Sequence, residues 1–314
     1  MSKVGKLTEE VTNMLIERQI NPQLVWVDTM HLTEAEKNTL LSDYELPLET
    51  LDYVTDIYEQ SNYIVDKDTD IQLMILHIPS KLSGQNKYLT RPISFLVKGH
   101  YVFTFYEGEP FVETDGLDKL LEDGEIITPL DFLLEGMNYY LTGFFPVLRE
   151  VTKERHKLDD LLTQRLTNKD LVQLASLQQT LTFFLSATET NLEALLSLEQ
   201  SKFGKNFSED ERERLSDVII EAQQLSHMAD LEVKIVNKIS QIFDSIMNNN
   251  LNDTMRFLTV WSLALAIPTL ITGFFGMNIN LPAVDHKYGW IYLIILSVIL
   301  IVWMFVALKR RRKM

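Results

Sequence analysis

The chain has 314 residues, of which 46% are hydrophobic, as is typical of a folded protein and not of a disordered one. It carries 44 acidic and 29 basic residues, a formal net charge of −15. This balance argues against a nucleic-acid partner, because phosphate binding needs a basic face. It fits cations better, although acidity also serves solubility alone. The absence of cysteine excludes disulfides and thiolate metal sites.

Residues 1–128 are expected to form an α/β domain. The runs "QLVWVD" and "IQLMILHI" have strand length, and "PISFLVKGHYVFTFYE" predicts a hairpin with Lys98, Gly99 and His100 at its turn. Thr33 and Pro47 stand where helices are expected to begin.

Helical spacing replaces the strand pattern from Pro129 onward. Residues 129–207 predict an antiparallel hairpin of two long helices, interrupted near Asn168. Ser208 is a predicted N-cap, with Glu211 three residues later. No glycine or proline intervenes before the next apolar run, so one helix is expected over 208–275, about 100 Å long. Such a helix requires partner helices to bury its apolar side.

Two runs without Asp, Glu, Lys or Arg close the chain, Phe257 to Phe275 and Tyr288 to Leu308. Each has about 20 residues, the length that crosses a bilayer, so both are predicted transmembrane helices. No cleavable signal peptide is recognisable at the N-terminus. The basic tail, residues 309–314, predicts by the positive-inside rule an integral protein of the cell membrane with both termini cytoplasmic. Residues 276–287 then form the external loop.

The first of these helices has two different faces. At 100° per residue the small or weakly polar side chains gather on one side, and Phe257, Trp261 and Ile271 lie opposite. This face permits two interpretations, close packing between helices or the lining of a pore shared by several copies. Amides at Asn248 to Asn250 favour the pore. The face comprises Asn252, Met255, Thr259, Ser262, Ala266, Thr269 and Gly273.

The sequences "NDTMRFLTV", "PTLITGFFGMN" and "YGW" resemble the CorA family of magnesium channels and transporters. That family carries Gly-Met-Asn at the outer end of the first of two C-terminal transmembrane helices. The resemblance extends over most of the chain after Thr128. It implies a funnel-shaped homopentamer in which Gly276, Met277 and Asn278 form the selectivity ring. It also implies that Asn252, Met255, Leu258, Ser262, Ala266 and Thr269 line the pore, with Met255 and Leu258 as the hydrophobic gate.

The expected function is passive uptake of hydrated Mg²⁺, driven by the membrane potential. Mg²⁺ gives up its water reluctantly, and the amide oxygens of an Asn278 ring can bind that water without charge. By the resemblance, Asp217 helps to hold regulatory Mg²⁺ between subunits. Asp66, Asp68 and Asp70 could add ligands or form a solvated loop. No organic cofactor is expected, and no phosphate-binding loop is present.

Three alternatives remain open. The six histidines are scattered and include no HExxH pair, which argues against an enzyme. A non-conducting membrane-anchored assembly protein would use the same helices. Transport of Co²⁺, Ni²⁺ or Zn²⁺ is possible on the same fold, although Met277 in the triplet favours magnesium.

Overall fold

The computed structural model describes residues 15–81, 88–106, 117, 121, 126–161, 167–277 and 288–311. The chain forms two compact units, Met1–Ser240 and Gln241–Met314. The boundary between them falls inside one helix and not at a loop.

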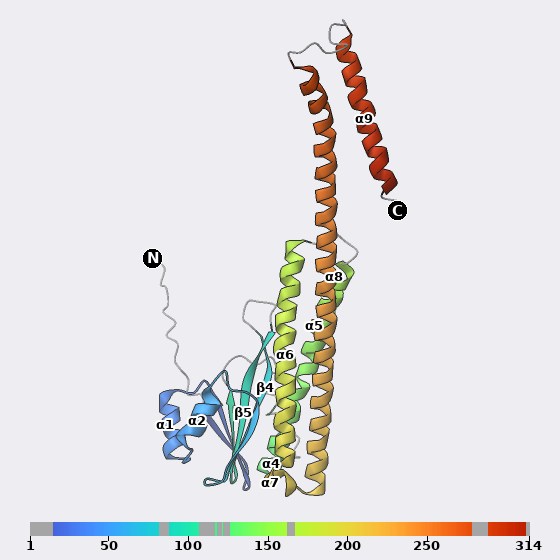
Figure 1. The fold of residues 1–314 in the computed structure, drawn as a ribbon. Coiled ribbons are helices and arrows are strands. Elements are labelled where there is room, and N and C mark those ends of the chain that lie inside the picture. Colours follow the sequence, from blue (N-terminus) through green and yellow to red (C-terminus); the bar gives the residue numbers. More distant parts are fainter. Residues whose placement is uncertain are drawn as a thin grey trace, which may run out of the picture. The chain divides into compact units, whose positions relative to one another are not determined.

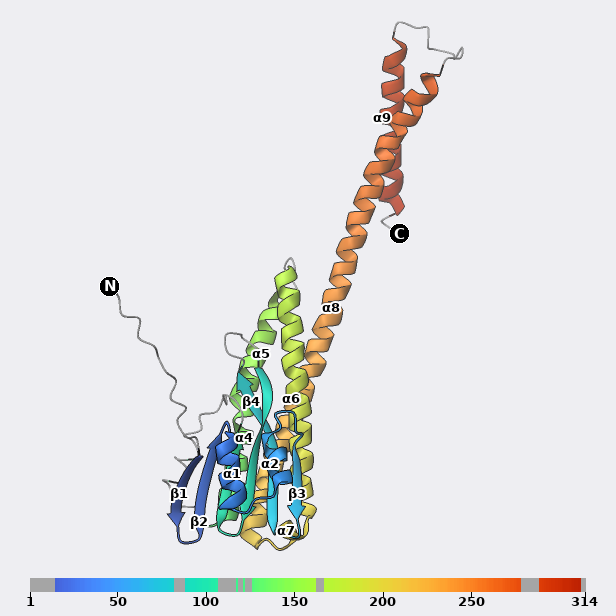
Figure 2. The ribbon, with the colours of Figure 1, turned by 90° about the vertical axis from the view of Figure 1, so that its left-hand side faces the viewer.

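A mixed six-stranded sheet forms one layer of the first unit (Figures 1 and 2). All neighbouring strands are antiparallel except β2 and β6, which are parallel. The expected α/β fold is therefore confirmed, with two strands, β1 and β3, that the sequence patterns did not reveal. The strands, in the order β1-β2-β6-β5-β4-β3, are β1 Leu15–Asn21, β2 Leu24–Met30, β3 Asn62–Asp66, β4 Ile71–Lys81, β5 Tyr88–Lys98 and β6 Tyr101–Tyr106.

The predicted hairpin is the pair β5 and β6. Lys98 pairs with Tyr101, so Gly99 and His100 make a two-residue turn. Gly99 adopts a φ of +60°, a backbone conformation that glycine reaches without a steric cost. The turn residue therefore has the conformational freedom that this connection requires.

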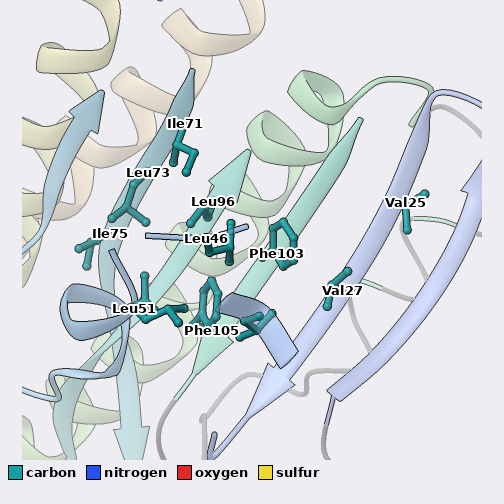
Figure 3. Close-up of a cluster of buried hydrophobic side chains, with 12 residues drawn as sticks. Val25, Val27, Leu46, Leu51, Ile71, Leu73, Ile75, Leu96, Phe103 and Phe105 are labelled. Carbon is teal, nitrogen blue, oxygen red and sulfur yellow. The ribbon is translucent and has the colours of Figure 1, made fainter. Parts of the chain in front are cut away.

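Two short helices, α1 (Glu34–Ser42) and α2 (Leu48–Thr55), pack on one face of the sheet. Thr33 begins α1 with a capping box, since its hydroxyl accepts the N–H of Glu36 while the Glu36 carboxylate accepts the N–H of Thr33. Their apolar side chains meet alternate residues of the strands in a buried cluster (Figure 3). The cluster contains Val25, Val27, Leu40, Leu46, Leu51, Val54, Ile71, Leu73, Ile75, Leu96, Phe103 and Phe105.

The other face of the sheet is covered by longer helices, so the central strands are buried on both sides. The ring of Trp26 lies 5.3 Å from that of Phe132, and Phe95 lies 6.0 Å from Tyr140. These helices are α4 Pro129–Thr142, α5 Phe144–Leu161 and α6 Asn168–Gln200, and the short α7 Lys202–Lys205 follows α6.

The expectation of one long helix between Pro129 and the turn before Asn168 is wrong, because the structure divides it into α4 and α5. Gly143 follows the last residue of α4 and has low helix propensity. Pro146, in the first turn of α5, has no N–H to donate back to Thr142, and its ring opposes a continuous helix through that point. Both residues fit a new helix start and disfavour a helix interior.

Helix α8 runs without a break from Glu209 to Phe275, and the expectation of one long helix is confirmed. Ser208 begins it as predicted, since its hydroxyl accepts the N–H of Glu211 while the Glu211 carboxylate accepts the N–H of Ser208. Helix α9 covers Gly289–Arg311. It lies in the same compact unit as the C-terminal part of α8 (Figure 1).

Candidate functional site

Two helices of the chain, α8 and α9, are long and apolar enough to cross a membrane. In α8 the apolar segment follows Arg256, which forms an exposed ion pair with Asp253 at 3.8 Å. Both helices present large apolar side chains such as Leu270 and Trp303 at their surfaces. This is the arrangement of side chains that a lipid environment favours and that water does not.

Helix α8 has one stripe of less exposed residues within the second unit. Ala264 and Ile271 are buried at 8% exposure, and the other members of the stripe are half-buried. In α9, Ser297 is buried at 6%. Because each stripe repeats at helical spacing in one compact unit, we interpret the two as the faces at which α8 and α9 meet. The α8 stripe comprises Val260, Ala264, Ile267, Pro268, Ile271 and Phe275, and the α9 stripe Gly289, Leu293, Ser297, Ile301 and Met304.

The face of α8 expected to line a pore is exposed, on the side away from this stripe. Met255 is 57% and Leu258 58% exposed, and Asn252 and Ala266 are exposed as well. Part of the face is hollowed into an open groove. Three groove residues, Leu265, Leu270 and Phe274, were not among those expected, and they flank the small residues on either side. The groove is lined by Ser262, Leu265, Ala266, Thr269, Leu270, Gly273, Phe274 and Met277.

The two threonine hydroxyl groups on this face bond back to their own helix. The Thr259 hydroxyl donates to the carbonyl of Met255 at 2.8 Å, and that of Thr269 donates to the carbonyl of Leu265 at 2.9 Å. A hydroxyl that donates its single hydrogen in this way keeps lone pairs that can accept hydrogen bonds. The face therefore offers neutral acceptors to water or to hydrated cations and carries no ionised group.

Helix α8 ends at Phe275, directly before Gly276 and Met277, the first two residues of the triplet expected to form the selectivity ring. The Gly276 N–H donates to Thr272 at 2.8 Å, and a Cβ on Gly276 would stand 3.0 Å from the Thr272 carbonyl oxygen. Gly276 has no positive φ, so close approach to Thr272 is what favours glycine there. Met277 is 53% exposed in the single chain. Asn278 and the rest of the segment expected to form the external loop lie outside the described residues.

The four aspartates considered for regulation lie in two places. Asp217 is exposed on α8, whereas Asp66, Asp68 and Asp70 belong to the turn between β3 and β4. The Asp66 carboxylate accepts hydrogen bonds from the Thr69 hydroxyl at 2.6 Å and the Asp68 N–H at 2.9 Å, and these bonds lower its pKa. Asp66 thus has a structural role in the turn. Across the described ranges, no three acidic or histidine side chains gather into a metal site.

An α/β sheet layer followed by two C-terminal helices that are long and apolar enough to cross a membrane, α8 and α9, is the arrangement expected of a two-span membrane protein. The family described as "CorA-like Mg2+ transporter protein" matches residues 21–310, nearly the whole chain. The protein therefore belongs to the CorA family, whose members are membrane transporters, and the resemblance stated from the sequence is confirmed.

Among its relatives, the "Cobalt/magnesium transport protein CorA" of Methanocaldococcus jannaschii is 23% identical over 296 residues, covering 92% of this chain and 90% of the relative. The complete structure of the CorA magnesium transporter from that organism matches with a TM-score of 0.76 at 22% identity, over 92% of this chain and 90% of the other. Full-length CmaX matches with a TM-score of 0.72 at 15% identity, over 98% and 93%. These structural matches support the expected fold.

Proposed function

We propose that this protein is a passive channel for Mg²⁺ uptake, formed by several copies of the chain around a shared axis, with five as the expected number. The observation that carries the proposal is the two-sided character of α8. One side, around Ala264 and Ile271, is buried where α9 is inferred to lie, and the other stays exposed with small and hydroxyl side chains. A lone chain in lipid would gain nothing from exposed neutral polar groups, whereas a shared water-filled axis would use them.

The filter in this proposal is the ring of Gly276, Met277 and Asn278. Mg²⁺ prefers oxygen ligands and loses its water shell reluctantly, so a selective ring should bind the hydrated ion. Asn278 supplies neutral amide oxygens for this purpose. Below it, Thr269, Ser262 and the other residues of the exposed face line the path, and the ring of Met255 and Leu258 forms an apolar gate.

The proposed orientation has both termini in the cytoplasm of a cell-membrane protein. Lys309 and Arg310 directly follow the apolar part of α9, and three more basic residues come after them. An inside-negative potential then drives entry, contributing about 4.6 kcal/mol per 100 mV for a divalent ion. No nucleotide or organic cofactor is needed for transport in this direction.

Regulation is proposed to act through Mg²⁺ bound between the α8 helices of neighbouring subunits. Asp217 is exposed and so is available to a second copy of the chain. Acidic groups brought together without the ion repel one another, which would loosen the closed assembly. Asp66, Asp68 and Asp70 remain candidates for further ligands, although the hydrogen bonds of Asp66 within its own turn make its carboxylate a weaker one.

Cobalt is the second candidate cargo, because the relative from Methanocaldococcus jannaschii is named as a cobalt/magnesium transport protein. Transport of Ni²⁺ or Zn²⁺ is examined in the same flux experiment. A non-conducting assembly protein is the remaining alternative, and it predicts no flux.

The test is ion flux into proteoliposomes that contain the full chain, with Mg²⁺, Co²⁺, Ni²⁺ and Zn²⁺ supplied singly and in competition. We expect potential-driven Mg²⁺ entry, and we expect Asn278→Ala to abolish selectivity for Mg²⁺. Asn280→Ala is the matched control, since it removes the same amide two residues further along the chain. Flux and selectivity unchanged in Asn278→Ala would refute the filter, and absence of flux from the parent protein would refute the channel.

A further inference from the structure

The buried seam of α8 in the first unit contains a single charged residue. Its members recur at alternating steps of three and four residues, the spacing of helices that pack along their length. Every position is apolar except Glu232, which is only 9% exposed. The seam consists of Leu215, Val218, Ala222, Leu225, Ala229, Glu232, Val236 and Ile239.

Helix α5 repeats this arrangement. Its buried residues follow the same spacing, and again one of them is charged, Arg155, at 7% exposure. The other residues at this spacing are Phe144, Leu148, Val151 and Leu158, and Val147 is buried beside them. Two apolar seams thus carry one charge each, and the two charges are of opposite sign.

These two charged residues are bonded to each other. The Arg155 Nε donates to Glu232 Oε2 at 2.7 Å, and the Thr152 hydroxyl donates to Glu232 Oε1 at 2.9 Å. The Arg155 guanidinium also lies 3.4 Å from Asp159 and 3.2 Å from the ring nitrogen of His156. Both carboxylate oxygens of Glu232 therefore have a donor on α5.

An apolar seam alone fixes the axial position of a helix poorly. A shift of α8 by seven residues, about 10 Å, would place Leu225 or Ile239 where Glu232 now lies and would keep apolar against apolar. The same shift would separate the buried Glu232 carboxylate from both of its donors, and it would leave the Arg155 guanidinium only the more exposed Asp159 and His156 of its own helix. Breaking a buried ion pair in this way is strongly unfavourable. Ala222 and Ala229 add little resistance, because small side chains interlock weakly with a neighbouring helix.

The other polar contacts of α8 in this unit are more exposed. Gln178 on α6 donates to Asn237 at 3.2 Å at the surface. Arg214 bonds Asp131 at 2.7 Å; the Asp131 side chain is as buried as that of Glu232, at 12% exposure, but 30% of the arginine side chain is exposed, against 9% for Arg155. Water competes for exposed groups, so these contacts constrain the register less than a buried charge pair does.

We propose that Glu232 is a positioning residue: with Arg155 and Thr152 it sets the axial register of α8 against α5, while the apolar seam supplies most of the stability. Helix α8 continues unbroken to Phe275, so one helix carries both this contact and the segment assigned to the pore. Only the assignment of that segment rests on the proposed function.

The chain has no native cysteine, so the register can be measured by disulfide formation in the full-length protein. Gln178→Cys with Asn237→Cys reports the observed register, since those side chains are in contact. Gln178→Cys with Asp230→Cys reports a register shifted by seven residues, the shift that would place Leu225 where Glu232 now lies. Each pair is placed in the parent and in Arg155→Met/Glu232→Leu, which removes both charges and keeps apolar volume.

In the parent we expect the first pair to cross-link and the second not to. In the Arg155→Met/Glu232→Leu background we expect cross-linking of the first pair to slow by about threefold or more, the lower range for coupled buried pairs. Thermal stability should be equal or higher, because apolar residues that replace both members of a buried ion pair are well tolerated. Unchanged cross-linking of the first pair would overturn the proposal.

Two controls separate register from general loosening. Val236→Ala weakens the same seam without removing a charge, and we expect it to lower stability while the first pair still cross-links at the parent rate. If the double variant does not fold, Glu232→Gln replaces it, since its amide oxygen can still accept from Arg155 or Thr152. An intermediate slowing in Glu232→Gln supports the proposal, and a rate equal to that of the parent contradicts it.

Discussion

At the scale of single residues, Asn191 completes the sheet at the point where β3 stops. Asn62, the first residue of β3, pairs with Ile75 of β4, so His77 lies beyond the end of that pairing. The Asn191 amide donates to the His77 carbonyl at 2.8 Å, and its oxygen accepts the His77 N–H at 2.8 Å and the Ser61 hydroxyl at 2.7 Å. A side chain thus satisfies backbone groups that would otherwise be left without partners.

Asn191→Ala should therefore destabilise the first unit by about 2–4 kcal/mol, because it leaves partly buried backbone and hydroxyl groups unpaired. Thermal or denaturant unfolding of the purified protein measures the change. Asn38→Ala is the control, since the Asn38 amide makes an exposed bond to Glu34 and its loss should cost well under about 1 kcal/mol. Equal effects of the two substitutions would contradict the role assigned to Asn191.

His77 adds a dependence on pH at the same place. Burial lowers the pKa of its ring below the ordinary value of 6.5, and the hydrogen bond to the Glu59 carbonyl opposes that shift. The unfolded chain then binds a proton at His77 more readily than the folded chain does. The contribution of neutral His77 to the free energy of unfolding is therefore fully present above pH 6.5 and is lost as the pH falls below that value.

His77→Gln should flatten the loss of stability between pH 6.5 and about 5, because the buried titrating group is gone. Unfolding midpoints measured across this range test the expectation. The exposed His227 provides the comparison, and His227→Gln should keep the slope of the parent. A parent-like slope in His77→Gln would assign the acid sensitivity to other groups.

At the scale of elements, α4 approaches the sheet closely at Gly136. A Cβ there would stand 2.7 Å from Cε1 of Phe95 on β5 and 3.1 Å from Cζ of the same ring. Phe95 is itself fully buried, so its ring has little room to move. Glycine is needed at this position for space and not for its backbone conformation.

Gly136→Ala should lower the free energy of unfolding by about 1–3 kcal/mol through overpacking. Phe95→Leu in the same chain should recover part of this loss, because the smaller side chain vacates the clash. A double-mutant cycle measures the coupling. Strictly additive effects would show that the ring of Phe95 is not what opposes the alanine.

The elements that the sequence predicted are those set by neighbours in the chain. Thr33 and Ser208 specify helix starts through residues three positions away, and Gly99 specifies a turn between adjacent strands. Strand β1, by contrast, is largely polar, and its conformation depends on pairing with β2. The parallel pairing of β2 with β6 joins segments more than 70 residues apart, which no local pattern encodes.

Two signals in the sequence were present but were not used. Gly143 and Pro146 together mark the break between α4 and α5. Glu232 occupies an apolar position in the repeat of α8, which indicates a buried polar contact, although the identity of its partner, Arg155, depends on the packing of α5. The candidate pore face was predictable because helical spacing alone defines it, whereas the contribution of Leu265 and Leu270 to the groove required the structure.

At the scale of the whole molecule, the acidic balance of the chain has a consequence for assembly. A net charge of −15 is multiplied in any homo-oligomer, so like charges at the interfaces oppose association unless cations screen or bridge them. Bound Mg²⁺ would then favour the tight, closed assembly, and its loss would favour a looser one. The charge balance that argues against a nucleic-acid partner thus favours divalent cations at the interfaces between subunits.

Asp217→Ala should therefore weaken inhibition by internal Mg²⁺, shifting the inhibitory concentration upward by about tenfold, the order expected for a ligand that contributes 1–3 kcal/mol of coupling. Flux into proteoliposomes loaded with graded Mg²⁺ measures the shift. Glu213→Ala is the matched control, because it removes an exposed acid one turn earlier on α8. Equal shifts in both variants would assign the effect to overall charge, and no shift in Asp217→Ala would exclude that residue from the regulatory site. Both variants keep Asn278, so their selectivity for Mg²⁺ should equal that of the parent. A change in selectivity would therefore indicate damage to the pore and not loss of regulation.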